Sequence, residues 1–224
     1  MRRAAAVFLF AALPALAGSV SGRVTLSGKA PVLPPTTVRQ DPRTCGTTQP
    51  DESLIVSAKG GIKNAVVFLE GAASPPPSPD AGQAVIDQIA CRYLPHVQAV
   101  RVGARLVTAN SDPILHTIRA TVDGGTLFNV AMPIQGMRKA FALTQPGLIR
   151  AACDAGHTWM LAWVYAFDHP YFAVTGDDGS FEIRGVPPGK YRLHAWQERL
   201  GTQEQEIHVK GDAAAQATFT YRSP

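Results

Sequence analysis

The sequence lacks the signatures of several classes of protein. Behind its first residues, no apolar run reaches the roughly 18 residues that a membrane-spanning helix needs. No cluster of Lys and Arg is present, so there is no electrostatic footprint for nucleic acid. The motifs of serine hydrolases, zinc peptidases and nucleotide-binding loops are also missing. We therefore expect a protein that spans no membrane, binds no nucleic acid and carries out no hydrolysis of these kinds.

Residues 1–17 have the pattern of a cleaved export signal. Arg2 and Arg3 precede an apolar stretch, and Ala15-Leu16-Ala17 matches the small-residue motif at which signal peptides are cut. Removal of this segment leaves 224 − 17 = 207 residues and lowers the net charge from +4 to +2. The pattern predicts a periplasmic or secreted protein.

Cysteine is scarce, and its odd count is informative. In an oxidising compartment, two of the three cysteines are expected to pair. Cys45 and Cys91 lie in turn-like sequence, whereas Cys153 has a His and a Met within seven residues. We therefore predict a Cys45–Cys91 disulfide and a free Cys153. A Cys91–Cys153 bridge and an intermolecular disulfide are the alternatives.

Signals for helices are almost absent, whereas signals for strands recur along the chain. Residues 19–27 alternate apolar and polar side chains, and residues 63–70 form an apolar run rich in β-branched residues. Further strands are expected within residues 98–110, 148–153, 159–167, 181–183, 191–196, 204–209 and 216–221. Gly and Pro punctuate these runs. The pattern predicts an all-β fold of sandwiches or small barrels.

Four side chains that bind soft metals are the most informative feature of the sequence. Cys153, His157 and Met160 lie within eight residues, and His116 precedes them on a separate segment. Imidazole suits Cu(II), while thiolate and thioether suit Cu(I), so this set accommodates copper in both oxidation states. Ligands that are close in sequence meet at little entropic cost, and Gly156 permits a sharp turn. The residues predict a mononuclear copper site.

Two segments resemble the cupredoxins. Residues 107–116 (VTANSDPILH) resemble the strand-end N-x-D…H element of that family, and residues 153–160 (CDAGHTWM) resemble its ligand loop. The resemblance extends to exported cupredoxin-like and methylamine-utilisation-type proteins. It implies a Greek-key β-sandwich with a blue-copper site whose ligands are the imidazoles of His116 and His157, the thiolate of Cys153 and the axial thioether of Met160.

The resemblance also implies a function. Four protein ligands leave no open position for a substrate, so we expect an electron-transfer protein with a redox partner protein, and not an enzyme. Asn110 is expected to tie the two ligand loops together by hydrogen bonds. His96 either supports the site from outside or is an ordinary turn histidine. Trp159 and Leu161 are expected to form an apolar wall around the metal.

Three further segments resemble the carboxypeptidase regulatory-like domain, a prealbumin-like β-sandwich. They are residues 22–28 (GRVTLSG), 65–71 (AVVFLEG) and 175–193 (TGDDGSFEIRGVPPGKYRL). Every candidate copper ligand lies between the second and third segments. The resemblance thus implies a cupredoxin-like domain inserted into a regulatory-like sandwich, with a serial arrangement as the alternative. The expected division is a signal peptide (1–17), first sandwich part (18–73), Pro-rich linker (74–82), copper domain (83–167) and second sandwich part (168–224).

Two other functions remain open from the sequence. The first is an exported module that binds carbohydrate or protein through an aromatic platform formed by Trp163, Tyr171, Tyr191 and Trp196. The second is copper storage or delivery, which would show copper binding without a reversible redox couple.

Overall fold

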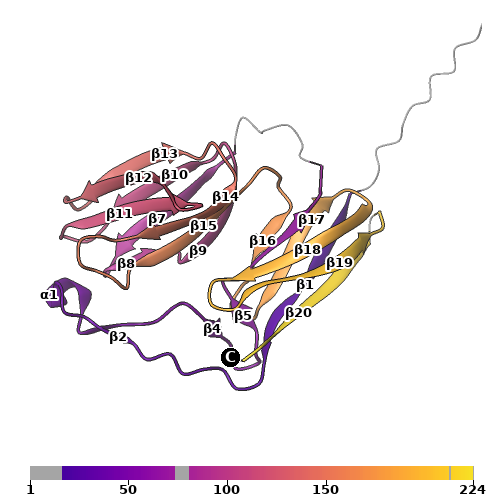
Figure 1. The fold of residues 1–224 in the computed structure, drawn as a ribbon, viewed down its shortest axis with the longest axis horizontal. Coiled ribbons are helices and arrows are strands. Elements are labelled where there is room, and N and C mark those ends of the chain that lie inside the picture. The colour runs from indigo at the N-terminus through magenta and orange to yellow at the C-terminus, as the bar shows by residue number, and fades with distance from the viewer. Residues whose placement is uncertain (1–16, 74–80, 212, 224) are drawn as a thin grey trace, which may run out of the picture.

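The structure, a computed structural model, describes residues 17–73, 81–211 and 213–223 (Figure 1). Residues 1–16 of the predicted signal peptide and residues 74–80 of the predicted Pro-rich linker lie outside the described residues. The described chain forms two β-sandwiches side by side, which confirms the predicted all-β class. Within the described ranges, no helix is long and apolar enough to cross a membrane.

The first sandwich contains both ends of the described chain. One sheet has the order β17-β1-β20, with bounds Ser180–Val186, Gly18–Ser27 and Ala214–Arg222. The other has the order β16-β6-β18-β19, with bounds Phe172–Val174, Val66–Glu70, Gly189–Gln197 and Gly201–Val209. Buried apolar side chains from both sheets, among them Val24, Leu69, Ile183, Leu193 and Phe219, form its core.

The second sandwich contains the candidate copper ligands. One sheet has the order β13-β10-β7-β8, with bounds Arg138–Ala142, Arg105–Asn110, Gln83–Ile89 and Arg92–Leu94. The other has the order β12-β11-β14-β15-β9, with bounds Gly125–Met132, His116–Val122, Gly147–Ala152, Leu161–Phe167 and Val97–Arg101. Side chains along β11 alternate between buried and half-buried positions, which directs one face of the strand into the core.

The sheets of the first sandwich combine strands that precede the second sandwich in sequence with strands that follow it. Strand β1 pairs antiparallel with β17 and parallel with β20, while β6 pairs with β16 and β18. The Leu69 amide donates a hydrogen bond to the Tyr171 carbonyl at 3.1 Å, so the chain leaves the first sandwich beside the point where it returns. These pairings are the ones that a nested arrangement requires. The domain bounds stay a prediction.

Aromatic side chains fill the contact between the sandwiches. The ring of Phe68 on β6 lies 5.2 Å from that of Tyr165 and 4.9 Å from that of Phe167, both on β15. Trp163 and Trp196 pack edge to face at 5.4 Å. Each such pair contributes roughly 0.5–1.5 kcal/mol beyond the burial of its area. Trp163 and Trp196 thus pack against each other, and Tyr171 is buried in the core of the first sandwich. A carbohydrate-binding platform of aromatic residues stays a prediction.

A long excursion of the chain runs from β1 past the second sandwich and returns to β6 of the first. Its short elements are β2 (Thr36–Thr37), α1 (Pro42–Cys45), β3 (Thr48–Gln49), β4 (Ile55–Val56) and β5 (Ile62–Lys63). Figure 1 shows it passing from β1 to α1, at the far end of the second sandwich, and then back. We call residues 36–50 the strap. The structure joins the strap to the second sandwich by a Cys45–Cys91 disulfide, the pair that the cysteine count favoured.

Candidate metal centre

The predicted ligands meet at one end of the second sandwich. His116 begins β11, and Cys153 directly follows β14; the antiparallel pairing of these strands, which aligns Arg119 with Ala152, brings both residues to the same edge. His157 lies in the loop before β15. Neither imidazole is exposed to solvent, and Cys153 is buried as well.

Three of the four predicted ligands bring their donor atoms together. The Nδ1 atoms of His116 and His157 are 3.2 Å apart, and Cys153 Sγ lies 3.7 Å from Nδ1 of His157. Candidate donor atoms of these three residues all lie within 4.8 Å of one another. Met160 is buried in the same apolar core as Cys153. The Met160 amide also donates to the His157 carbonyl at 3.0 Å, which closes the ligand loop.

The turn in this loop depends on Gly156. Its φ of +92° lies in the left-handed region, where a side chain is strained, as the sequence led us to expect. An ideal Cβ at Gly156 would lie 3.4 Å from the side chain of Gln40 in the strap. The strap thus packs directly on the ligand loop.

Carboxylates hold the outer nitrogens of both imidazoles. Nε2 of His116 lies 2.9 Å from Asp112, and Nε2 of His157 lies 3.0 Å from Asp41. An ionised carboxylate only accepts hydrogen bonds, so we assign the ring proton of each neutral imidazole to Nε2. The two Nδ1 lone pairs then face each other at 3.2 Å. Such an arrangement requires a proton or a metal cation between the rings, and the donor set therefore fits a metal ion.

The sulfur of Cys153 is prepared to act as a thiolate. Burial alone would raise the pKa of Cys153, but the interactions of the sulfur with the His116 ring, with the Thr117 and Ala155 amides and with the His157 ring outweigh burial and lower this pKa to about 6. The Thr117 amide lies 3.5 Å from Sγ. Because the thiolate is the form of cysteine that binds metals, the sulfur is available at neutral pH.

The same interactions affect the imidazole of His116. Burial alone would lower its pKa, yet the hydrogen bonds and charges of Cys153 and Asp112 outweigh burial and raise the pKa above its ordinary value. A metal ion bound at Nδ1 would therefore replace a proton.

Asn110 is buried and organises the approach to His116. Its Nδ2 donates to the carbonyls of Ile114 at 3.0 Å and Met132 at 2.7 Å, and its Oδ1 accepts from the Asp112 amide at 3.0 Å. These bonds fix the loop before His116 and strand β12. The sequence predicted a tie to the Cys153–Met160 loop, whereas the described bonds of Asn110 go to other segments.

Asp112 and Asp41 are functional candidates that the sequence reasoning missed. The Asp112 carboxylate accepts hydrogen bonds from the Ala90 and Cys91 amides at 2.7 and 2.8 Å, besides its contact with His116. Its place four residues before His116, within the N-x-D…H segment, was a usable signal. Asp41 lies 116 residues from His157 in sequence, so no local pattern indicated its role.

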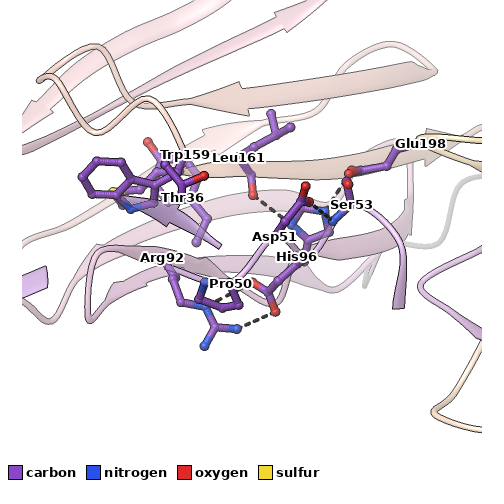
Figure 2. Close-up of a pocket in the computed structure, with 12 residues that line it drawn as sticks. Thr36, Pro50, Asp51, Ser53, Arg92, His96, Trp159, Leu161 and Glu198 are labelled. Carbon is purple, nitrogen blue, oxygen red and sulfur yellow. Dashed lines mark hydrogen bonds and ion pairs between the residues drawn. The ribbon is translucent and has the colours of Figure 1, made fainter. Parts of the chain in front are cut away.

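Trp159 packs against the centre, whereas His96 lines a cavity together with Trp159 and Met160. The Trp159 ring lies 5.4 Å from the His157 ring, and its Nε1 donates to the Cys91 carbonyl at 2.9 Å. The His96 ring lies 3.0 Å from the Leu161 carbonyl through Nδ1 and 2.8 Å from the Glu198 carboxylate through Nε2. Figure 2 shows these contacts among the residues that line the cavity, whose volume is about 180 Å³. The described hydrogen bonds of His96 thus join the strand after the ligand loop to the first sandwich.

Comparisons with known proteins give partial similarities. A family model, polysaccharide lyase family 4, domain II, matches residues 153–217, less than half of the chain. No curated protein matches the sequence.

Among solved structures, a purple cupredoxin from Nitrosopumilus maritimus is 24% identical with a TM-score of 0.33, and the match covers 38% of this chain and 99% of that one. An oxidised proline-to-alanine variant of amicyanin is 18% identical with a TM-score of 0.35, covering 45% of this chain and 98% of that one. A copper-containing nitrite reductase from Thermus scotoductus is 18% identical with a TM-score of 0.33, covering 44% of this chain and 24% of that one.

Proposed function

We propose that the protein is an exported electron-transfer protein that binds one copper ion at His116, Cys153, His157 and Met160. One observation carries the proposal: two imidazole Nδ1 atoms and a thiolate sulfur converge in a buried site. The carboxylates on both Nε2 atoms support it, because they direct the two Nδ1 lone pairs toward the same point.

The donor types favour copper over other metals. Two imidazoles with one thiolate and a weak thioether suit both oxidation states of copper, which would supply a one-electron couple at this site. The ligands stand at the ends of strands or in a loop closed by hydrogen bonds. This chain would therefore hold the ligands in nearly the same positions in both states, and burial would exclude water from them.

We further propose transfer of electrons to a partner protein, and not catalysis. The four ligands would fill the positions around the metal, which leaves none for a substrate. Export to the periplasm or the exterior follows from the leader pattern of the sequence. Storage or delivery of copper is the competing function, and it would show copper binding without a reversible redox couple.

The proposal is tested by adding Cu(II) to the purified apo-protein. We expect one copper per chain and the intense visible absorption of a Cu(II)–thiolate bond. Substitution Cys153→Ser should abolish the absorption, whereas His208→Gln, which changes an exposed histidine on β19, should preserve it. A colourless mixture in which Cys153 is shown to be free would contradict the proposal. A coloured protein without a reversible couple in voltammetry would favour storage or delivery.

A further inference from the structure

The strap brings an unexpected side chain to the candidate copper centre. The excursion that contains the strap leaves the first sandwich after β1 and reaches α1 at the far end of the second sandwich (Figure 1). The Cys45–Cys91 disulfide fixes the end of α1. Gln49 adds hydrogen bonds to the carbonyls of Cys45 at 2.5 Å and Ala90 at 3.0 Å. The strap is therefore attached to the second sandwich at Cys45 and again at Gln49.

Asp41 has an unusual conformation for its position. It is the N-cap of α1, where an aspartate usually accepts a hydrogen bond from an amide of the first turn. Here the side chain makes no capping bond, and the backbone lies in the left-handed region, with φ 51° and ψ 47°. Non-glycine residues in this region cost energy and often serve a function. The carboxylate instead accepts a hydrogen bond from Nε2 of His157 at 3.0 Å.

The strap also encloses the ring of His157. The imidazole has no exposed surface, although 36% of the Asp41 side chain is exposed. Trp159 packs against the ring from the ligand loop, and Gln40 lies over Gly156. Asp41 therefore separates the outer edge of His157 from solvent.

We propose that Asp41 is a positioning residue: from the strap, it holds His157 in place, closes its Nε2 edge and lowers the reduction potential of the bound copper. The inference rests on the proposed copper function. A carboxylate that accepts the outer N–H of a ligating imidazole makes that imidazole a stronger donor, and loss of such a partner typically weakens metal binding about 10–100-fold. The negative charge stabilises Cu(II) more than Cu(I), because Cu(II) carries the larger charge.

Two variants separate this role from a structural one. Asp41→Asn keeps the size and a hydrogen-bond acceptor but removes the charge. Asp41→Gly removes the side chain and also relieves the left-handed backbone, which glycine adopts without strain. The matched control is Asp154→Asn, which removes a carboxylate next to the ligand Cys153 that pairs with Arg119 at 2.7 Å, not with an imidazole.

We expect both Asp41 variants to reduce the ratio of Cu(II) to Cu(I) affinity about tenfold, which is a rise in reduction potential of about 59 mV for one electron. Asp154→Asn should raise the reduction potential far less. In proton–nitrogen NMR of the diamagnetic apo and Cu(I) proteins, the Nε2–H of His157 should exchange slowly with water in the wild type and rapidly in Asp41→Gly.

Equal potentials in the Asp41 and Asp154 variants, or rapid exchange of the Nε2–H in the wild type, would overturn the inference. A wild-type protein without copper–thiolate absorption would instead refute the proposed function, an outcome that the spectrum identifies before any potential is measured. The exchange measurement on the apo-protein does not depend on copper.

Discussion

Removal of the Cys45–Cys91 disulfide should destabilise the protein by an amount that its position predicts. The bridge joins the strap to the second sandwich, and the bonded residues are separated by 46 positions in sequence. Both cysteines are buried. The perturbation is the double substitution of Cys45 and Cys91 by Ala, which leaves no new thiol to compete for copper.

The magnitude follows from the entropy of loop closure. For a loop of about 46 residues, the bridge lowers the entropy of the unfolded chain by about 13.5 cal/mol/K, or about 4 kcal/mol at 25 °C. The carbonyl of Cys91 also accepts a hydrogen bond from Trp159, and that of Cys45 accepts one from Gln49. These contacts do not require sulfur, so the cross-link itself should dominate the loss.

The assay is chemical denaturation of the apo-protein, followed by tryptophan fluorescence and circular dichroism. The double variant should unfold with a free energy lower by about 4 kcal/mol than the wild type. The control Cys153→Ala retains the bridge and should lose only the packing of one buried sulfur. If the free energy of unfolding of the double variant fell by less than about 1 kcal/mol, or by no more than that of Cys153→Ala, the reasoning that the disulfide stabilises the protein through loop closure would be refuted.

Two further predictions concern the contact between the sandwiches. Burial alone would lower the pKa of His96, but the hydrogen bond and charge of Glu198 outweigh burial and hold the pKa above its ordinary value. This ion pair should therefore stabilise the fold fully below about pH 6.5, which is the pKa of a histidine in an unfolded chain. Its contribution should fade as the pH rises through the higher pKa of His96 in the folded protein. In urea titrations, the free energy of unfolding of Glu198→Gln should change less over this pH range than that of the wild type. If the two proteins showed the same dependence on pH, the role of the ion pair would be contradicted. Excision of residues 80–167, with a short Gly/Ser bridge, should leave a folded sandwich that binds no copper; loss of β-structure in its circular dichroism would contradict a nested, self-sufficient first sandwich.

The parts of the fold that the sequence predicted well are those with a local signal. Strand β1 alternates buried side chains with half-buried or exposed ones over most of its length, and β6 is an apolar run, so the local hydrophobic pattern located both. Strand β12 escaped prediction because its outward face also carries apolar residues, Leu127 and Ala131, so the sequence does not alternate apolar and polar although burial in the structure does. Helix α1 has four residues, too few for a helical period.

The residues of the candidate site were likewise predicted only where the sequence carries a local signal. The spacing of Cys153, His157 and Met160, with the motif around His116, indicated the donor set from local sequence alone. Asp41 was beyond such reasoning, because an aspartate before a proline is typical of an ordinary helix cap. Its contact with His157 arises only when the strap crosses from one sandwich to the other. Likewise, the partner of His96 is 102 residues away in sequence.

X-ray absorption spectroscopy of the copper-loaded protein tests the central claim most directly, because it counts the atoms bound to the metal. We predict two nitrogen scatterers from imidazoles and one short sulfur scatterer, with the sulfur lost in Cys153→Ser and one nitrogen lost in His116→Ala. Copper bound by nitrogen and oxygen alone in the wild type, or a sulfur scatterer that persists without Cys153, would contradict the proposed site.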